Sequence, residues 1–399
     1  MTTSPEERAK TLARTRDLKM AHSVHAYVRG NTAQFYAWLA ASDASRAVPT
    51  GPPVWICGDC HLGNLGPLAD AKGRVDVQIR DLDQTVIGNP ALDLIRLGLS
   101  LETAARSSDL PGITTSRMVE AMIDGYARAL TPPKDDDLPE PDVVKSVRRK
   151  AMGRRWRNLA KDRIEDVEPT IPRGKRFWSL TEAEREGIVS LFGEPEVRRR
   201  TLELARLDTD DGIRVVDAAY WRKGCSSLGR LRYAVLLGIS RKKGKETFAL
   251  VDIKEASGSV APAAPGANMP LDAAKRVVSG AKALAPNLGQ RMVPATLLSV
   301  PVVLRELAPQ DLKIEVEQFS RKEAIASSGY LAYVVGIAHA RQLDDATRMY
   351  WHRLLLDGPK SSGGSNWLWQ AIVELAGLHE AGYLEHCRRT ALADGTVAA

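Results

Sequence analysis

Two apolar runs that each end in polar side chains constrain this chain more than any other feature. The first run is Val54 to Cys57, and the second is the alternating set Val75, Val77 and Ile79. Strands that deliver side chains to a site have this pattern. We expect the second strand to fold back beside the first, so that both polar loops open at one edge of a sheet. The polar residues in these loops are Asp59, His61, Asn64, Asp81 and Asp83.

The types and spacing of these polar residues are typical of a phosphoryl-transfer site. In such a site one Asp orients the hydroxyl nucleophile, while an Asn and a second Asp hold magnesium through oxygen atoms. Here Asp59 follows the first strand, Asn64 comes five residues later, and Asp81 and Asp83 follow the second strand. The sequence therefore predicts Asp59, Asn64 and Asp81 as catalytic residues, and Asn64, Asp81 and Asp83 as magnesium ligands.

Composition limits the class of protein. Of the 399 residues, 44% are hydrophobic and 26% are charged, which is typical of a globular protein with a sizeable core. No apolar run approaches the roughly 18 residues of a membrane span, and the charged N-terminus has no signal-peptide core. We therefore expect a cytoplasmic protein with no membrane partner. The net charge of +7 suits anionic small molecules as well as nucleic acid, which is the less expected partner.

The four cysteines are too few and too scattered for a disulfide framework, so we expect reduced thiols. Cys57, Cys60 and His61 satisfy the C-x-x-C-H pattern of haem attachment and the C-x-x-C pattern of zinc or redox sites. Haem attachment would need export, and zinc would need a second pair of ligands. Cys225 and Cys387 stand alone in the sequence, so both alternatives are the weaker interpretations.

Several helices are predicted by apolar spacing, and one strongly basic segment stands out. Residues 145–163 are rich in Lys and Arg, which indicates either a solvated helix face or a phosphate-facing surface. Residues 131–141 contain too many prolines for a helix. Residues 1–18 are expected to be frayed. The expected helices are 21–39, interrupted at Arg29 and Gly30, and then 92–105, 116–130, 271–284 and 321–341.

In residues 213–254, β-branched and apolar residues alternate or cluster between turns rich in Gly and Lys. This pattern predicts an antiparallel sheet with strands at 213–217, 231–239 and 247–254. Further strands are expected at 301–306 and 312–316. The first two strands are linked by a segment from Gly224 to Gly229, whose glycines would let backbone amides approach a phosphate, with Ser226 and Ser227 as hydroxyl donors. An ordinary hairpin loop is the alternative. Lys254 ends an apolar strand, so it should have an anionic partner.

Two motifs resemble a known type of kinase-like protein. GDCHLGN followed by RDLDQTVIGNPALDL is similar to the catalytic and metal loops of aminoglycoside phosphotransferases, whose patterns are HGDxHxxN and IDxxxxxxGDPxxDL. The resemblance places Asp59 on the catalytic base, Asn64 and Asp81 on the metal ligands, and Asp93 on the residue that braces the catalytic loop. His61 falls on the second His of the pattern as structural support, while Cys57 replaces the first.

More closely, about residues 19 to 345 resemble the bacterial domain of unknown function 2252 family. That family also carries segments like KMAHSVHAYVRGN, which contains Arg29, and GCSSLGRLRY with VDIKEA, which contain the Gly-rich loop and Lys254. The resemblance implies a site role for Arg29. Lys254, Gly224, Ser226, Ser227 and Gly229 would then be the nucleotide-binding residues.

The resemblance implies an α+β, protein-kinase-like fold with two lobes, one helical and one a smaller antiparallel sheet. Its activity would be ATP-dependent phosphoryl transfer, with ATP and Mg2+ as cofactors and an unknown hydroxyl-bearing small molecule or protein as acceptor. The catalytic loops come before the Gly-rich loop and Lys254, which is the order of a circular permutation. We expect a helical catalytic lobe at 1–205, a nucleotide-binding lobe at 206–318 and C-terminal helices at 319–399.

Two departures from the kinase pattern leave alternatives open. Kinases fix the phosphate-binding Lys with a Glu from a neighbouring helix, but Ser279 stands where the related family tends to have Glu. Asp272 or Glu255 must then pair with Lys254, or the pair is absent. Ser226 also replaces the middle glycine of the loop. A catalytically idle nucleotide-binding module is therefore the alternative function. A metallophosphoesterase is less expected, because the chain has no Asn-His dipeptide for its second metal motif.

Overall fold

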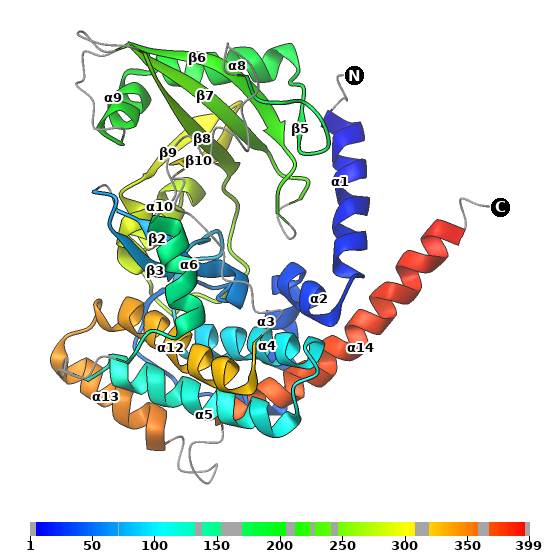
Figure 1. Ribbon diagram of the computed structural model, residues 1–399, viewed down its shortest axis with the longest axis vertical. Coiled ribbons are helices and arrows are strands. Elements are labelled where there is room, and N and C mark those ends of the chain that lie inside the picture. Colours follow the sequence, from blue (N-terminus) through cyan, green and yellow to red (C-terminus); the bar gives the residue numbers. More distant parts are fainter. Residues whose placement is uncertain are drawn as a thin grey trace.

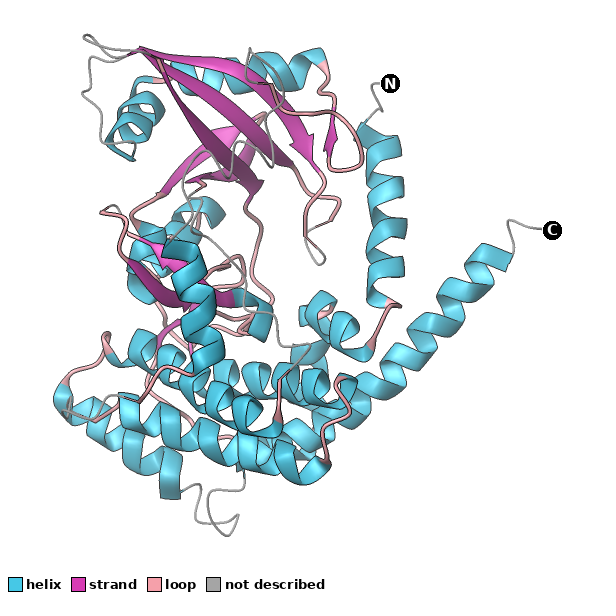
Figure 2. Cartoon of the chain, in the orientation of Figure 1, coloured by secondary structure: helices cyan, strands magenta, loops and turns pink. Residues whose placement is uncertain are grey.

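The computed structural model describes residues 5–70, 72–131, 138–152, 170–204, 212–224, 228–240, 246–307, 319–357 and 367–395. Most helices gather at one end of the molecule, and the largest sheet lies at the other (Figure 1, Figure 2). The chain therefore has the α+β fold class that its sequence predicts. Among the described helices, none is long and apolar enough to cross a membrane.

The described helices and strands have the following bounds. The helices are α1 Pro5–Met20, α2 Val24–Gly30, α3 Thr32–Ala41, α4 Ala91–Ser107, α5 Gly112–Ala129, α6 Asp142–Met152, α8 Glu182–Gly193, α9 Pro195–Leu204, α10 Ala273–Leu284, α11 Pro286–Gly289, α12 Arg321–Ala340, α13 Asp345–Asp357 and α14 Trp367–Gly395. The strands are β1 Val54–Ile56, β2 Leu65–Ala69, β3 Val75–Ile79, β4 Val86–Gly88, β5 Phe177–Trp178, β6 Gly212–Trp221, β7 Arg232–Ser240, β8 Thr247–Glu255, β9 Met292–Leu297 and β10 Val300–Glu306.

The helical end is built around α4, which is buried from Ala91 to Ala105. A helix that is apolar nearly all round belongs in the middle of a core, and α2, α5, α12 and α14 pack around it. Helices α5 and α12 approach unusually closely, because a Cβ added to Gly125 would lie 2.1 Å from the Gly329 carbonyl oxygen. Glycine at this crossing is therefore required by packing.

The large sheet has six antiparallel strands in the order β5-β6-β7-β8-β10-β9. Side chains alternate between its faces. One face packs on α8, α9 and Leu12 of α1, and the other packs on Ile171, Leu307 and the N-terminal part of α10. The boundary expected at residue 205 would place α8 and α9 in a different lobe from the sheet that they cover.

Most of the predicted elements are present. The helix expected at 21–39 is divided at Asn31 into α2 and α3, and the other four predicted helices correspond to α4, α5, α10 and α12. The three expected sheet strands are β6, β7 and β8. The strand predicted at 312–316 falls outside the described residues. Of the basic segment 145–163, residues 145–152 lie on α6 and the remainder falls outside the described residues.

Helix α1 and strand β9 are among the elements that the sequence did not predict. Residues 5–20 form α1, which tertiary contacts hold in place: Leu12 is buried, and Arg8 Nη1 lies 2.7 Å from the Glu184 carboxylate on α8. Strand β9 was missed because its hairpin with β10 turns at Leu298 and Ser299, both with positive φ. Such two-residue turns normally carry Asn-Gly or Asp-Gly, so the usual sequence signal is absent.

Candidate functional site

Two short antiparallel ladders bring the polar loops together. Strand β1 pairs with β4, so that Ile56 faces Val86, and β2 pairs with β3, so that Leu65 faces Ile79. The expected pairing of the 54–57 strand with the 75–79 strand was therefore wrong, because each strand takes a nearer partner of matching length. The loops at 57–64 and 80–85 nevertheless lie opposite each other, and the Arg80 N–H donates to the Asn64 carbonyl at 2.7 Å.

The loops touch at Gly58, which has φ +73°. A Cβ at this position would lie 2.1 Å from the Gln84 carbonyl oxygen of the second loop. Only glycine tolerates both the positive φ and the close approach of the second loop, because any other residue would strain the backbone and force the loops apart. This contact fixes the distance between the two sets of carboxylates.

Helix α4 holds the first loop through three polar residues on one face. Asp93 accepts the N–H groups of Cys57 at 2.7 Å and Gly58 at 2.9 Å. Arg96 Nε donates to Asp59 Oδ1 at 2.9 Å, and the Ser100 hydroxyl accepts the Leu62 N–H at 3.2 Å. Sequence analysis missed Arg96 and Ser100. Their signal was present, because polar residues at 93, 96 and 100 form a helical stripe in an otherwise apolar segment.

Asp93 is itself fixed by a buried hydrogen-bond chain. Its carboxylate lies 3.2 Å from His339 Nε2, and His339 Nδ1 lies 2.8 Å from the Tyr126 hydroxyl, which also accepts from Trp351 Nε1 at 3.1 Å. These residues come from α4, α5, α12 and α13. The first loop is therefore anchored to four helices of the core.

Asp59 is a buried carboxylate whose charge Arg96 balances. Burial raises the pKa of Asp59 above its usual value, while the Arg96 guanidinium opposes that rise. Asn64 Nδ2 donates to the Asp59 carbonyl at 2.9 Å, so the amide oxygen is the Asn64 atom that a cation could use. His61 Nε2 lies 3.9 Å from Asp59 Oδ2, and burial with the Arg29 and Arg96 charges holds the pKa of His61 well below its usual value. His61 is therefore neutral.

Lys254 joins the sheet to the second loop. Its Nζ lies 3.1 Å from both carboxylate oxygens of Asp81 and 2.5 Å from Asp83 Oδ2. Burial alone would raise the pKa of Asp81, but the Lys254 and Arg232 charges outweigh it and lower that pKa. Burial and the Asp81 charge raise the pKa of Asp83. The expected anionic partner of Lys254 is therefore the Asp81–Asp83 pair.

Neither candidate partner from the sequence contacts Lys254. Asp272 caps α10 by accepting the Lys275 N–H, and Glu255 accepts the Leu231 N–H. Of the two alternatives left open by the sequence, substitution by Asp272 or Glu255 is therefore not observed, because each of these carboxylates accepts a backbone N–H group. Helix α10 instead directs Arg276 toward the site, where its Nη2 donates to the Asp83 and Ser257 carbonyls at 2.8 Å.

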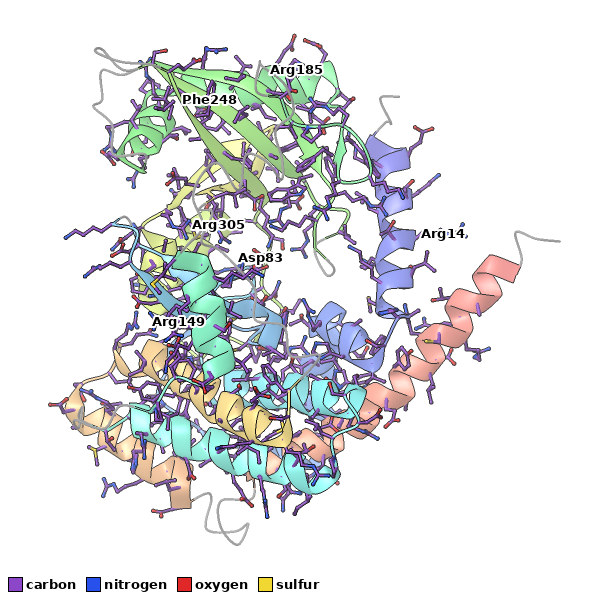
Figure 3. The ribbon with its side chains drawn as sticks, in the orientation of Figure 1. Arg14, Asp83, Arg149, Arg185, Phe248 and Arg305 are labelled. Atoms are coloured by element: carbon purple, nitrogen blue, oxygen red, sulfur yellow. The ribbon has the colours of Figure 1, made fainter. Side chains whose placement is uncertain are left out.

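The sheet surface beside Lys254 carries a buried ion pair that sequence analysis missed. Arg232 Nε lies 2.9 Å from Asp252 Oδ1, and the pKa of Asp252 is lowered because the Arg232 charge outweighs burial. Arg305 on β10 donates to the Arg80 carbonyl at 3.2 Å. Figure 3 shows Arg305 and Asp83 at the junction between the sheet and the loops. The sheet therefore contacts the second loop at several points.

The Gly-rich segment is described only in part, since Ser226 and Ser227 fall outside the described residues. Gly224 and Gly229 both have positive φ, and the Gly224 carbonyl accepts from Lys19 Nζ at 2.9 Å. Next to the segment, Arg230 donates to the Ser257 hydroxyl. Arg29, the remaining support candidate, packs against Gly63 beside Asn64, and its Nε has no hydrogen-bond partner among the described atoms.

Cys57, Cys60 and Asp93 place one ligand atom each within 4.8 Å of one another. Structural zinc sites use four ligands, and this group has three members within the described chain. Both Asp93 oxygens already accept backbone N–H groups. Burial raises the pKa of Cys57, which disfavours the thiolate that zinc needs. These residues fit a packed loop better than a metal centre.

The carboxylates open into a cavity of about 810 Å³. Asp59, Asn64, Asp81 and Asp83 line one wall, and we call these four residues the carboxylate wall. The other side is formed by Arg14, Arg16 and Asp17 of α1 with His386, Arg389 and Thr390 of α14, which we call the far wall. Gln84 and Arg230 also line the cavity. Four of the five polar loop residues identified in the sequence therefore line one cavity, and His61 is not among the residues that line it.

Fold and site together define an α+β protein with a polar cavity at the meeting point of a helical core and an antiparallel sheet. A family model described as "Uncharacterized protein conserved in bacteria (DUF2252)" matches residues 8–389. The chain therefore belongs to the DUF2252 family. No curated protein matches it, and no solved structure matches it.

Proposed function

We propose that this protein is an ATP-dependent phosphotransferase with a kinase-like, circularly permuted fold. The observation that carries the proposal is that Asp59, Asn64, Asp81 and Asp83 line one cavity while Lys254 contacts the last two. A base, oxygen ligands for magnesium and a phosphate-binding Lys are the parts that phosphoryl transfer needs.

The order of elements in the sheet supports the kinase-like part of the proposal. In kinases a Gly-rich loop covers the phosphates, the Lys lies on the third strand, and a helix follows it. Here β6 and β7 flank the segment from Gly224 to Gly229, Lys254 lies on β8, and α10 follows. The catalytic loops precede this sheet in the chain, in agreement with a permuted order.

The residues fit a magnesium–nucleotide complex. Asp81, Asp83 and the Asn64 amide supply the hard oxygen ligands that magnesium prefers, and the low pKa of Asp81 keeps its carboxylate ionised. Magnesium, when bound, would offset the charge of the phosphates. Lys254 would then exchange its carboxylate partners for phosphate oxygens. Asp59 would orient the acceptor hydroxyl and take its proton as the new P–O bond forms and ADP leaves.

The second candidate is a nucleotide-binding module without catalysis. It is favoured by the partners of Lys254: among the described residues these are Asp81 and Asp83 of the second loop, and not a Glu from a neighbouring helix, which active kinases need. A metallophosphoesterase is less favoured, because His386 of the far wall is the one histidine among the described residues that line the cavity.

Nucleotide binding and turnover test the proposal separately. A ligand at a hundred times its Kd stabilises a protein by about 2.7 kcal/mol, so ATP with magnesium should raise the melting temperature by a few degrees. Asp81→Asn should abolish the magnesium-dependent part of the shift, and Lys254→Ala should weaken the whole shift. Asp59→Asn should keep most of the shift but lose ADP formation, because the base contacts the acceptor.

Asp124→Asn is the matched control, since Asp124 is exposed on α5. It should change neither melting shift nor turnover. A nucleotide-induced shift without ADP formation, unchanged in Asp59→Asn, would favour the idle module. No shift with any nucleotide would overturn both candidates.

A further inference from the structure

The two sides of the cavity carry opposite charge patterns. The carboxylate wall is acidic, but its charges already have partners: Arg96 for Asp59, and Lys254 for Asp81 and Asp83. The far wall carries Arg14, Arg16 and Arg389. Arg16 pairs with Asp17 at 3.3 Å and Arg389 contacts Glu385 at 3.6 Å, so the arginines are in excess of the carboxylates. The cavity therefore has a basic end opposite its catalytic end.

Contacts between the two helices hold this basic end in place. His386 Nε2 lies 2.8 Å from the Asp17 carbonyl, and the Tyr383 hydroxyl donates to the Ala21 carbonyl at 3.1 Å. Figure 3 shows Arg14 on α1, on the side of the molecule across from Asp83. The arginines thus project from a braced pair of helices, which suits a binding wall.

We propose that the acceptor is a small hydroxyl compound carrying a phosphate or carboxylate group. Its anionic end would lie against Arg14, Arg16 and Arg389, and its hydroxyl would lie at Asp59. This inference rests on the proposed phosphotransferase function and names the substrate class of the same site. Arginine is well suited to the task, because its planar group binds carboxylates and phosphates through two hydrogen bonds.

Under the proposed function, the nucleotide phosphates would have other partners. Lys254 lies on the sheet side with Asp81 and Asp83, and Arg230 follows the Gly-rich segment. The far-wall arginines come from α1 and α14 instead. A volume of about 810 Å³ is also within the range of small-molecule pockets. A polycationic acceptor such as an aminoglycoside would be repelled by this wall.

Four three-carbon probes that differ mainly in charge test the inference. They are glycerol, glycerol 3-phosphate, glycerate and 3-aminopropane-1,2-diol. Binding to the full chain is measured by calorimetry, with and without magnesium and a non-hydrolysable ATP analogue. The two anionic probes should bind at least tenfold more tightly than glycerol and the amine, and their ratio separates a phosphate site from a carboxylate site.

The variants include a closely matched control. Arg388 and Arg389 are neighbours on α14 that both contact Glu385, but among the described residues only Arg389 lines the cavity. Arg389→Ala and Arg16→Ala should each weaken the anionic probes three- to tenfold and leave the nucleotide-induced melting shift in place. Arg388→Ala should change neither.

The outcomes separate the inference from the function on which it rests. Equal binding of all four probes, or anion binding that Arg16→Ala and Arg389→Ala leave intact, overturns the inference even if the nucleotide binds. Arginine-dependent anion binding without any nucleotide-induced shift overturns the phosphotransferase proposal and supports an anionic ligand site. Arginine-dependent anion binding together with nucleotide binding supports both.

Discussion

Arg96 and Asp93 lie one turn apart on α4 and hold two consecutive parts of the same loop. Arg96 Nε donates to the Asp59 carboxylate at 2.9 Å, while Asp93 accepts the N–H groups of Cys57 and Gly58. The proposed catalytic base is therefore positioned by a helix whose residues from Ala91 to Ala105 are all buried. A rigid element under a site keeps its groups at fixed distances.

Removing the Arg96 charge should both destabilise the protein and alter Asp59. Breaking a buried ion pair by deleting one partner costs roughly 3–5 kcal/mol, so Arg96→Met should lower the free energy of unfolding by about that amount. The pKa of Asp59 should rise further, because Arg96 now opposes the effect of burial. The acid limb in the pH profile of any activity that needs ionised Asp59 would then shift to a higher pH.

A double-mutant cycle measured by chemical denaturation checks the Arg96 prediction. Asp59→Asn combined with Arg96→Met should cost clearly less than the sum of the two single changes, because no uncompensated charge is left. Strictly additive losses would show that the two side chains do not depend on each other.

The hydrogen bonds of Asp93 should be visible in amide exchange. An Asn at this position has one acceptor oxygen in place of two, so Asp93→Asn should leave one buried N–H unpaired at a cost of about 1–3 kcal/mol. The amides of Cys57 and Gly58 should then exchange faster with solvent. Ser100→Ala is the comparison, since it frees only the Leu62 amide. Unchanged exchange at Cys57 and Gly58 would contradict the bracing role.

Gly58 and Gly73 offer a matched pair with φ values of +73° and +77°. Apart from its chain neighbours, no described atom lies within 4 Å of a Cβ built at Gly73, whereas at Gly58 the Gln84 carbonyl oxygen lies at 2.1 Å. Gly73→Ala should cost about 1 kcal/mol from backbone strain alone. Gly58→Ala should cost several times more and displace the two loops. Melting temperatures of both variants decide this, and similar losses would refute the close approach.

His379 should make stability fall in acid. Its ring is fully buried beside Trp38, and burial lowers its pKa from 6.5 to about 4. The neutral ring is favoured in the folded state, so its contribution is complete above pH 6.5 and is lost as the pH falls toward 4. At 1.36 kcal/mol per pKa unit, wild type should lose roughly 3 kcal/mol between pH 7.5 and 4 relative to His379→Gln.

Subtracting the two pH profiles removes the contribution of groups common to both proteins. His22→Gln serves as the control, because His22 is exposed. Its profile should follow that of wild type. A wild-type profile parallel to that of His379→Gln would mean that the pKa of this ring is the same in the folded and unfolded states, and would refute the prediction.

Local patterns were sufficient to predict which loop residues converge. Asp59, Asn64, Asp81 and Asp83 each follow an apolar run, and the cavity receives all four. The strand partners were beyond such reasoning, because β1 and β4 have three residues each and carry little register information. Pairing of such short segments is decided by the surrounding core rather than by their own sequence.

Long-range pairings were equally inaccessible. Asp272 and Glu255 were the candidate partners of Lys254 in the sequence, with no pair as the alternative, but Lys254 contacts Asp81 and Asp83 from a distant segment. Helix α1 has a weak apolar pattern and forms against α8 through Arg8 and Leu12. In both cases the deciding partner is far away in the sequence, so spacing within a short window could not reveal it.

The position of the sheet within the chain has a consequence for biogenesis. Helix α5 is synthesised before the sheet, whereas its close partner α12 is synthesised after it. On the ribosome, the antiparallel sheet and its covering helices α8 and α9 can assemble from neighbouring segments. The helical core must wait for α12, and the far wall of the cavity must wait for α14. A nascent chain therefore holds its carboxylates in an unfinished core and acquires a complete site only in the last stage of its synthesis.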